Sequence, residues 1–338
     1  MKIDGALSMS VRGSGAEAAS FETMGLDGAW SFEASHDPFM PLTLASQTTE
    51  RIDLGTAIAV AYARTPMTAA HTAWDLQRLS GGRFILGLGT QIKPHIEKRY
   101  GMPWSKPAAR MRDYVHALRA IWASWSTGER LDYRGDFYSH TLMTPFFSPG
   151  ANDTASPPVY VAGVGPRMVQ VIGEVADGFF VHPFHSVDFL HAETLPALAD
   201  GARSVERDVA EVDIACLTVV AMGTDEAELT DARRKAKAQL AFYGSTPAYA
   251  GVLDHHGYEG LQPELNAMSK QGQWREMTDR IDDDLLELIA VTGTPAEVGR
   301  KLAARNGFAH RSTMMFYGPT PSDESIAEAV DACRAAAS

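Results

Sequence analysis

The chain has 338 residues, of which 45% are hydrophobic and 21% charged, and its formal net charge is −12. This composition can bury a full core, so it excludes a disordered chain, and the length allows one large domain or two ordinary ones. The acidic balance lacks any block of basic residues, which argues against nucleic acid or an anionic membrane as a partner. We find neither an apolar signal core nor an apolar stretch of ~18 residues, so we expect a soluble cytoplasmic protein.

Apolar runs typical of buried strands alternate with helical patterns along the whole chain. We predict strands at residues 3–9, 28–32, 54–61, 84–89, 159–162, 177–181, 212–222 and 312–317. We predict helices at residues 15–24, 38–49, 67–79, 110–125, 166–175, 188–209, 225–242, 295–305 and 322–337. Eight strands that alternate with helices are the number in a (β/α)8 TIM barrel, which is an α/β fold.

The clearest single unit lies in residues 53–91, where two apolar runs flank a helical pattern that Gly81-Gly82 ends. Strand, helix and strand in this order predict a βαβ unit of a buried parallel sheet. We expect one domain over residues 1–338, with inserted segments near 131–150 and 243–284, because these two stretches show the least pattern. Trp122 and Trp125 suggest an apolar helix face, which either packs in the core between barrel and helices or contributes to a possible homodimer.

The loops that follow barrel strands are where a TIM barrel places its chemistry. After the second strand come Glu33, His36 and Asp37, which predict either proton transfer or a helix-capping loop with a solvated histidine. After the third strand come Tyr62 and Arg64, which are either site residues or part of a loop with a partly buried arginine.

Glycines follow the fourth and fifth strands. Gly89 and Thr90 end the fourth strand, and glycine there lets backbone approach a flat ligand. The spacing is not a dinucleotide fingerprint, because no GxGxxG opens a helix. After the fifth strand, Gly163-Val164-Gly165 leads into a helix that begins at Pro166, which suits a phosphate or a tight turn without ligand. After the sixth strand, His182 and His185 are either ligand contacts or packed loop residues.

Other catalytic signatures are missing from the sequence. It contains no nucleophile elbow, no Walker motif and no HExxH. Cys216 and Cys333 lie far apart in apolar contexts, which predicts two free buried thiols, and we expect no metal site. Glycine-lined surfaces with histidines and aromatic residues favour a cofactor that performs the difficult step itself.

The chain resembles the bacterial luciferase-like superfamily, and in particular its coenzyme F420-dependent oxidoreductases. The resemblance rests on residues 53–91, on residues 159–184 and on the segment GTPAEVGRKLA at residues 293–303. It implies a TIM barrel with an inserted region and a flavin or deazaflavin across the strand ends. It also implies a cis peptide bond between Ala57 and Ile58, in a bulge behind the cofactor ring.

The resemblance further implies which residues bind the cofactor. The ring would be lined by Ala59, Val60, Gly89 and Thr90, in addition to the bulge at Ala57 and Ile58. The phosphate would lie on Ala162, Gly163 and Val164, with Gly178 and Phe179 nearby.

One position departs from the family. Many F420-dependent members have an acid followed by histidine after the second strand, whereas this chain has Glu33-Ala34 and places its histidine at His36. We therefore expect Glu33 and His36 as the catalytic residues, with His36 reaching the site by another loop path, or else proton transfer elsewhere.

Three functions follow from these observations. The first is an F420-dependent oxidoreductase that passes a hydride between the deazaflavin and an unidentified small organic substrate. The second is an FMN-dependent luciferase-like monooxygenase that uses reduced flavin and O2. The third is a barrel that binds a flavin or another ligand without turnover, which the residue Ala34 motivates.

Overall fold

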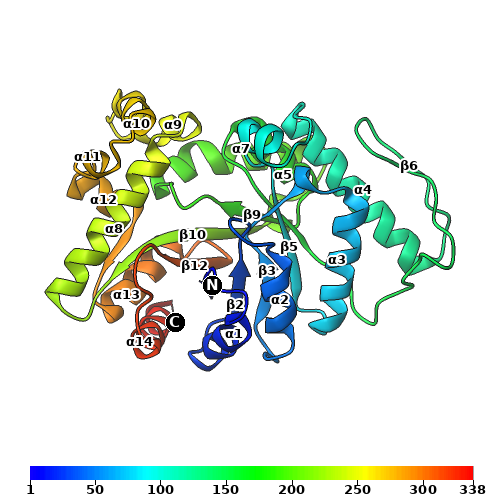
Figure 1. Ribbon diagram of the computed structural model, residues 1–338, viewed down its shortest axis with the longest axis horizontal. Helices are drawn as coiled ribbons and strands as arrows, with labels where there is room; N and C mark the ends of the chain where they lie inside the picture. Colours follow the sequence, from blue (N-terminus) through cyan, green and yellow to red (C-terminus); the bar gives the residue numbers. More distant parts are fainter. Residues whose placement is uncertain (338) are drawn as a thin grey trace.

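A computed structural model describes residues 1–337 of the chain. Within these residues eight parallel strands close into a (β/α)8 TIM barrel, so the predicted fold is confirmed (Figure 1). Neighbours around the barrel are β1, β2, β3, β5, β8, β9, β10 and β12, and β12 pairs with β1 to close the ring. These strands span Lys2–Ala6, Gly28–Ser31, Asp53–Thr56, Phe84–Gly89, Val159–Ala162, Gly178–Val181, Asp213–Met222 and Arg311–Phe316.

Helices surround the barrel where the sequence predicts them. The helix α13 begins with a capping box in which the Thr294 and Glu297 side chains satisfy the free N–H groups of its first turn. The helix α4 ends at Gly128, whose φ of 75° is the left-handed conformation that favours glycine. The surrounding helices are α1 (Ser14–Thr23), α2 (Phe39–Ser46), α3 (Pro66–Leu79), α4 (Pro107–Thr127), α5 (Pro166–Val175), α7 (Leu195–Ser204), α13 (Pro295–Asn306) and α14 (Asp323–Ala337).

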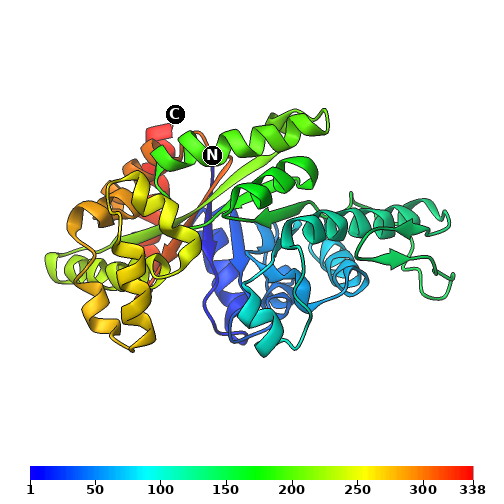
Figure 2. The same cartoon turned by 90° about the horizontal axis from the view of Figure 1, so that it is seen from above.

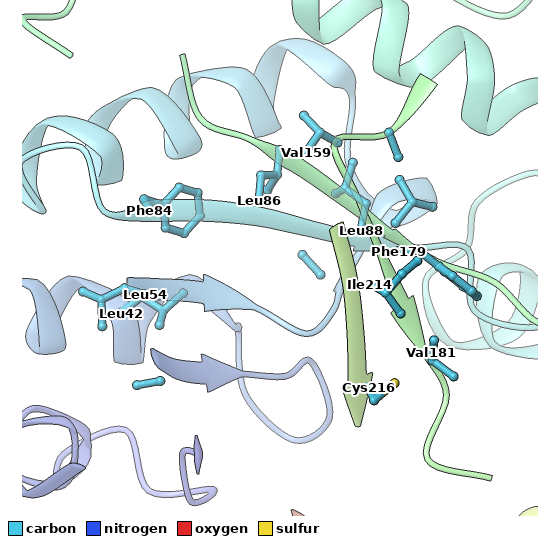
Figure 3. Close-up of a cluster of buried hydrophobic side chains, with 14 of the residues drawn as sticks. Leu42, Leu54, Phe84, Leu86, Leu88, Val159, Phe179, Val181, Ile214 and Cys216 are labelled. Carbon is cyan, nitrogen blue, oxygen red and sulfur yellow. The ribbon is translucent and has the colours of Figure 1, made fainter. Parts of the chain in front are cut away.

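The main apolar core lies between the strands and these helices. Figure 3 shows side chains of neighbouring strands in this layer, including Leu88 of β5 and Phe179 and Val181 of β9. Trp122 and Trp125 of α4 are only 2% exposed and belong to the same core, so neither tryptophan offers a surface for a second subunit. Cys216 and Cys333 are free and buried, as predicted.

The barrel interior is packed rather than hollow. A second cluster of large side chains fills it, with Trp30 packed edge-on against Phe180 at a ring-centroid distance of 5.1 Å. At the amino-terminal ends of the strands, Arg311 forms ion pairs with Asp4 at 2.8 Å and with Asp53 at 2.6 Å. These charges close the lower end of the barrel, so a ligand can approach the interior from the carboxyl ends of the strands.

A helical insertion stands beside this open end, between β10 and α13. Its helices form an apolar core with Val219 and Ala221 of β10. These two residues lie on the same face of β10 as Ala215 and Leu217, which point into the barrel interior. The predicted insertion at residues 243–284 lies within it, and the helix predicted at 225–242 belongs to it rather than to the barrel wall. Figure 1 shows it in colours from yellow-green to orange: α8 (Glu226–Gly244), η5 (Pro247–Tyr249), α9 (Ala250–His255), α10 (Leu261–Lys270), α11 (Trp274–Thr278), α12 (Asp283–Ile289) and β11 (Val291–Gly293).

The second inserted segment extends from the opposite side, beyond α4 (Figure 2). It contains the hairpin strands β6 (Tyr133–Arg134) and β7 (Ser139–His140). Asp113 of α4 anchors it by accepting hydrogen bonds from the backbone N–H groups of Phe137 at 2.6 Å and Tyr138 at 3.0 Å. The remaining short elements are β4 (Ala59–Val60), η1 (Ala61–Ala63), η2 (His95–Arg99), α6 (Val187–Phe189), η3 (Leu190–Thr194) and η4 (Val209–Glu211). Among residues 1–337, no helix combines the length and apolar character needed to cross a membrane.

Candidate active site at the mouth of the barrel

The third barrel strand is interrupted by a bulge at the mouth. Gly55 lies opposite Ile85 of β5, whereas Ala59 lies opposite Leu88. The bulged strand therefore uses one residue more than β5 over the same span, which pushes backbone toward the barrel axis. The peptide bond between Ala57 and Ile58, at the centre of the bulge, is cis, as the sequence resemblance predicted.

Two glycines of β5 make room for this bulge. A Cβ atom on Gly87 would lie 1.7 Å from the carbonyl oxygen of Thr56, and one on Gly89 would lie 2.7 Å from Cδ1 of Ile58. The Thr56 hydroxyl replaces the interrupted ladder, because it donates to the Gly87 carbonyl at 2.6 Å and accepts from the Gly87 N–H at 2.9 Å. The glycines of this strand thus serve the bulge itself, which brings Ile58 to the mouth.

The bulge forms part of an apolar floor across the mouth. Ala57, Ile58, Ala162 and Met315 are half-buried and pack on top of the interior cluster. They come from different strands, but the carboxyl ends of parallel strands meet at one end of a barrel. The floor is therefore a flat apolar surface that a ring system can cover.

Glu33 holds the bulge in place. Its Oε2 atom accepts hydrogen bonds from the Val60 N–H at 2.7 Å and from Arg64 at 2.5 Å, and Oε1 accepts from the Tyr100 hydroxyl at 2.8 Å. Its own N–H donates to the carbonyl of Ile58 at 3.1 Å. The Glu33 side chain is only 6% exposed, so both carboxylate oxygens are committed to protein donors.

His36 has different surroundings. Its side chain is exposed and makes no hydrogen bond or ion pair within residues 1–337. The adjacent Asp37 accepts from the backbone N–H of Phe39 at 2.9 Å and pairs with Arg64 at 3.0 Å, so it both opens α2 and joins the Glu33 network. The structure therefore brings Glu33 to the bulge and leaves His36 on the rim of the mouth.

The other residues expected along the ring divide into two groups. Ala59 and Val60 are 0% exposed and face the outer core, so their side chains do not line the mouth. The reason is the bulge, which shifts the inward-facing positions of this strand to Ala57 and Ile58. Gly89 is buried beneath Ile58, while Thr90 is half-buried and its hydroxyl donates to the Gln91 carbonyl at 2.9 Å.

The turn between β8 and α5 offers free backbone donors. Ala162, Gly163 and Val164 are half-buried, and the N–H groups of Gly163, Val164 and Gly165 donate to no acceptor within residues 1–337. A Cβ atom on Gly163 would lie 2.4 Å from Cγ of Met168, so glycine is required for the tight path of the chain. Unpaired N–H groups at a helix N-terminus suit an anion such as a phosphate.

Gly178 and Phe179 lie elsewhere, and the structure does not bring them to this turn. Gly178 pairs with Tyr160, two residues below Ala162, so it sits in the lower half of the barrel wall. The Phe179 side chain is 1% exposed and points into the outer core (Figure 3). The residue that β9 delivers to the mouth is instead His182, just beyond its end.

His182 is surrounded by aromatic side chains of the insertion. Its ring stacks on Tyr249 at a centroid distance of 4.3 Å and meets the edge of Tyr243 at 4.7 Å. Tyr317, which follows β12, joins this group because its hydroxyl lies 2.7 Å from that of Tyr243. From the sequence, His182 was either a ligand contact or a packed loop residue. No signal in the sequence placed residues 243, 249 and 317 beside it.

Two partners of Glu33 were also missed as site residues or left open. Tyr100 lies in a region without a recognisable pattern, and Arg64 was equally compatible with a loop that holds a partly buried arginine. A buried carboxylate needs hydrogen-bond donors. The need for donors to Glu33 is therefore the signal that could have predicted Arg64 and Tyr100 as its partners. Among residues 1–337, no group of three or more potential ligands gathers as a metal site.

Fold and site together define a TIM barrel whose mouth combines a flat apolar floor with a turn of unpaired backbone N–H groups. Comparison with protein families agrees: the luciferase-like monooxygenase family matches residues 5–311. The chain belongs to this family.

Individual relatives were also found. An uncharacterized protein of Mycobacterium tuberculosis is 49% identical over 293 residues, which cover 87% of this chain and 86% of that protein. The 5,10-methylenetetrahydromethanopterin reductase of Archaeoglobus fulgidus is 28% identical over 288 residues, with 82% and 81% covered. Among solved structures, the coenzyme F420-dependent tetrahydromethanopterin reductase of Methanopyrus kandleri superposes with a TM-score of 0.79 at 22% identity, covering 97% of this chain and 96% of that one.

Proposed function

We propose that this protein is a coenzyme F420-dependent oxidoreductase that passes a hydride between the deazaflavin and an organic substrate. The observation that carries the proposal is the pairing of a flat apolar floor at Ala57 and Ile58 with free N–H donors at the β8–α5 turn. A tricyclic ring that bears a phosphate on a flexible chain matches both surfaces. The F420 dependence of the Methanopyrus kandleri reductase supports the choice of cofactor.

The residues present fit this group. Ala57, Ile58 and Thr90 would hold the ring, and Gly163 and Val164 would hold the phosphate through their backbone N–H groups. When bound, F420 would accept a hydride at C5 of its ring in the oxidised form, or donate one from C5 in the reduced form. The chain itself orients the two reactants over the floor and excludes water from it, and this is the main contribution of a protein to such a transfer.

For Glu33 we propose a positioning role. Its carboxylate binds Val60, Arg64 and Tyr100 at once, so it fixes the height of the bulge on which the ring would lie. His36 remains our proposal for proton transfer, because its imidazole is exposed on the rim and has no partner within residues 1–337.

We also propose a homodimer. The support is an exposed apolar group on the segment beyond α4, where Leu142, Phe146 and Phe147 are 78%, 89% and 66% exposed. Exposed apolar side chains that cluster are typical of protein contact surfaces. Sedimentation velocity of the purified chain, compared with a Phe146→Ser/Phe147→Ser variant, tests this, and a monomeric wild type would contradict it.

Titration of the purified protein with F420 and with FMN tests the cofactor. We expect F420 fluorescence to report saturable binding, and substrate-dependent loss of the oxidised deazaflavin absorbance to report turnover. Tight binding of FMN alone, together with O2 consumption in the presence of reduced FMN, would replace the proposal with a luciferase-like monooxygenase. Binding of either cofactor without turnover of any substrate would favour a non-catalytic barrel.

A further inference from the structure

The hydrogen on the His182 ring has a defined position. The backbone N–H of Phe184 donates to Nδ1 of His182 at 3.1 Å. A ring nitrogen that accepts a hydrogen bond carries no hydrogen, so the ring hydrogen is on Nε2. Burial lowers the pKa of His182 to about 3, so the imidazole is uncharged at neutral pH.

This Nε2–H group has no partner of its own. Within residues 1–337 nothing accepts from Nε2 of His182, and the atom is not sealed inside the protein, in contrast to Nε2 of the neighbouring His185. The ring is held rigidly, since Tyr249 stacks on its face and Tyr243 meets it at an interplanar angle of 77°. A fixed donor without a protein partner therefore lies beside the mouth of the barrel and is not fully buried.

The aromatic side chains around this donor are uncharged and partly exposed. The Tyr243 and Tyr317 hydroxyls share one hydrogen bond at 2.7 Å, which uses one of the two O–H groups, and both residues also offer a ligand ring surface. Burial and the neighbouring Tyr243 raise the pKa of Tyr317 well above its usual range, so this phenol stays protonated. No arginine or lysine within residues 1–337 stacks on the rings of His182, Tyr243, Tyr249 or Tyr317. The surface suits an uncharged ring rather than an anion.

We propose that Nε2–H of His182 donates a hydrogen bond to an oxygen atom of the substrate, whose adjoining ring packs against Tyr249, Tyr243 and Tyr317. The substrate class is then an uncharged, ring-bearing molecule with a hydrogen-bond-accepting oxygen. That this molecule is the substrate rests on the proposed function, whereas its binding beside His182 does not. Three parts of the chain build the site: the end of β9, the α8–η5 part of the insertion, and the end of β12.

Two isosteric probes test the donor. Acetophenone has an accepting carbonyl oxygen on a ring, and α-methylstyrene has the same shape with a CH2 group in place of that oxygen. We expect wild-type protein to bind acetophenone about tenfold more tightly than α-methylstyrene, as measured by ligand-observed NMR titration, because the unmatched probe leaves a desolvated donor unpaired.

Two substitutions separate the ring nitrogens. His182→Asn keeps an acceptor where Nδ1 binds the Phe184 N–H but has no group at the position of Nε2, while His182→Gln places an amide N–H near Nε2. We expect the Asn variant to bind both probes equally and the Gln variant to retain the preference for acetophenone. The control is His191→Phe, which replaces an exposed histidine elsewhere in the chain. Preference for acetophenone in a folded Asn variant, or its loss in a folded Gln variant, would overturn the proposal.

If the variants do not fold, a measurement on the unmodified protein tests the proposal in their place. Acetophenone should shift the 15N resonance of His182 Nε2, and α-methylstyrene should not; no binding of either probe, or equal shifts with both, would also overturn the proposal. F420 titration of the same samples is scored separately. Protein that shows the His182-dependent preference but does not bind F420 contradicts only the proposed function, and the reverse result contradicts only this inference.

Discussion

Glu33 and Arg64 are joined by an ion pair of 2.5 Å between Oε2 and Nη1, and the same carboxylate oxygen receives the N–H of Val60 at 2.7 Å. One oxygen atom thus links the end of β2, the bulged strand and the loop that opens α3. Arg64 completes the link by donating to the Val60 carbonyl at 3.1 Å. Because the bulge has no regular ladder of its own, these side-chain contacts determine where it lies.

Removal of the Glu33 carboxylate should destabilise the protein strongly. In Glu33→Ala, Arg64 is left as a largely buried cation whose main partner is gone, a change that typically costs ~3–5 kcal/mol. Urea denaturation measures the loss. The matched control is Asp37→Ala, because Asp37 pairs with the same arginine but is 44% exposed and should cost less than ~1 kcal/mol. Equal losses in the two variants would show that the Glu33 contacts do not hold the bulge.

Tyr100 should titrate at unusually high pH. Burial and its hydrogen bond to Glu33 raise the pKa of Tyr100 to about 12. Since this folded pKa lies above the unfolded value near ~10, the stability it contributes is present below pH ~10 and is lost as pH rises through about 12. Tyrosinate absorbance of wild type minus Tyr100→Phe isolates this group. A difference spectrum that appears near pH 10 would contradict the contact, and loss of the hydrogen bond itself should cost ~1 kcal/mol at pH 7.

The β8–α5 turn offers a matched pair of glycines. In Gly163→Ala the new methyl group would meet Met168, so the turn must shift and its free N–H groups with it. In Gly165→Ala the methyl group meets nothing within 4 Å and the φ of −75° suits alanine. We expect F420 affinity to fall at least about tenfold in the first variant and to stay within about twofold in the second, as measured by fluorescence titration. Equal affinity in both variants would place the phosphate elsewhere.

Acid should destabilise the lower end of the barrel through Asp53. Burial raises the pKa of Asp53, but the charges of Arg311 and Lys2 outweigh it, so the net pKa is lowered. A lowered folded pKa contributes stability above the unfolded value near ~3.9, and this contribution is lost as pH falls further. Urea unfolding between pH 6 and pH 3 should therefore show a smaller loss for Asp53→Asn than for wild type. Identical pH profiles would show that Asp53 does not contribute to acid stability.

The strand pattern could be predicted from the sequence because each barrel strand is a short apolar run between turn signals. All eight predicted strands have counterparts in the barrel, and the bulge at Ala57 and Ile58 was expected from the family resemblance. The insertion was predicted too short at its start. The helix at Glu226–Gly244 has the same local pattern as a barrel helix, and only its packing against Val219 and Ala221 assigns it to the insertion.

The sequence by itself determined the order of strands and helices, the glycine-rich turn at Gly163, and the acid Glu33 at the end of β2, because these depend on neighbouring residues. Tertiary structure alone decided which groups meet: Tyr100 on Glu33, the insertion's Tyr249 on His182, and Phe179 in the outer core. The physical reason is that these contacts join segments tens of residues apart. Their partners are chosen by barrel closure and side-chain packing rather than by any local pattern.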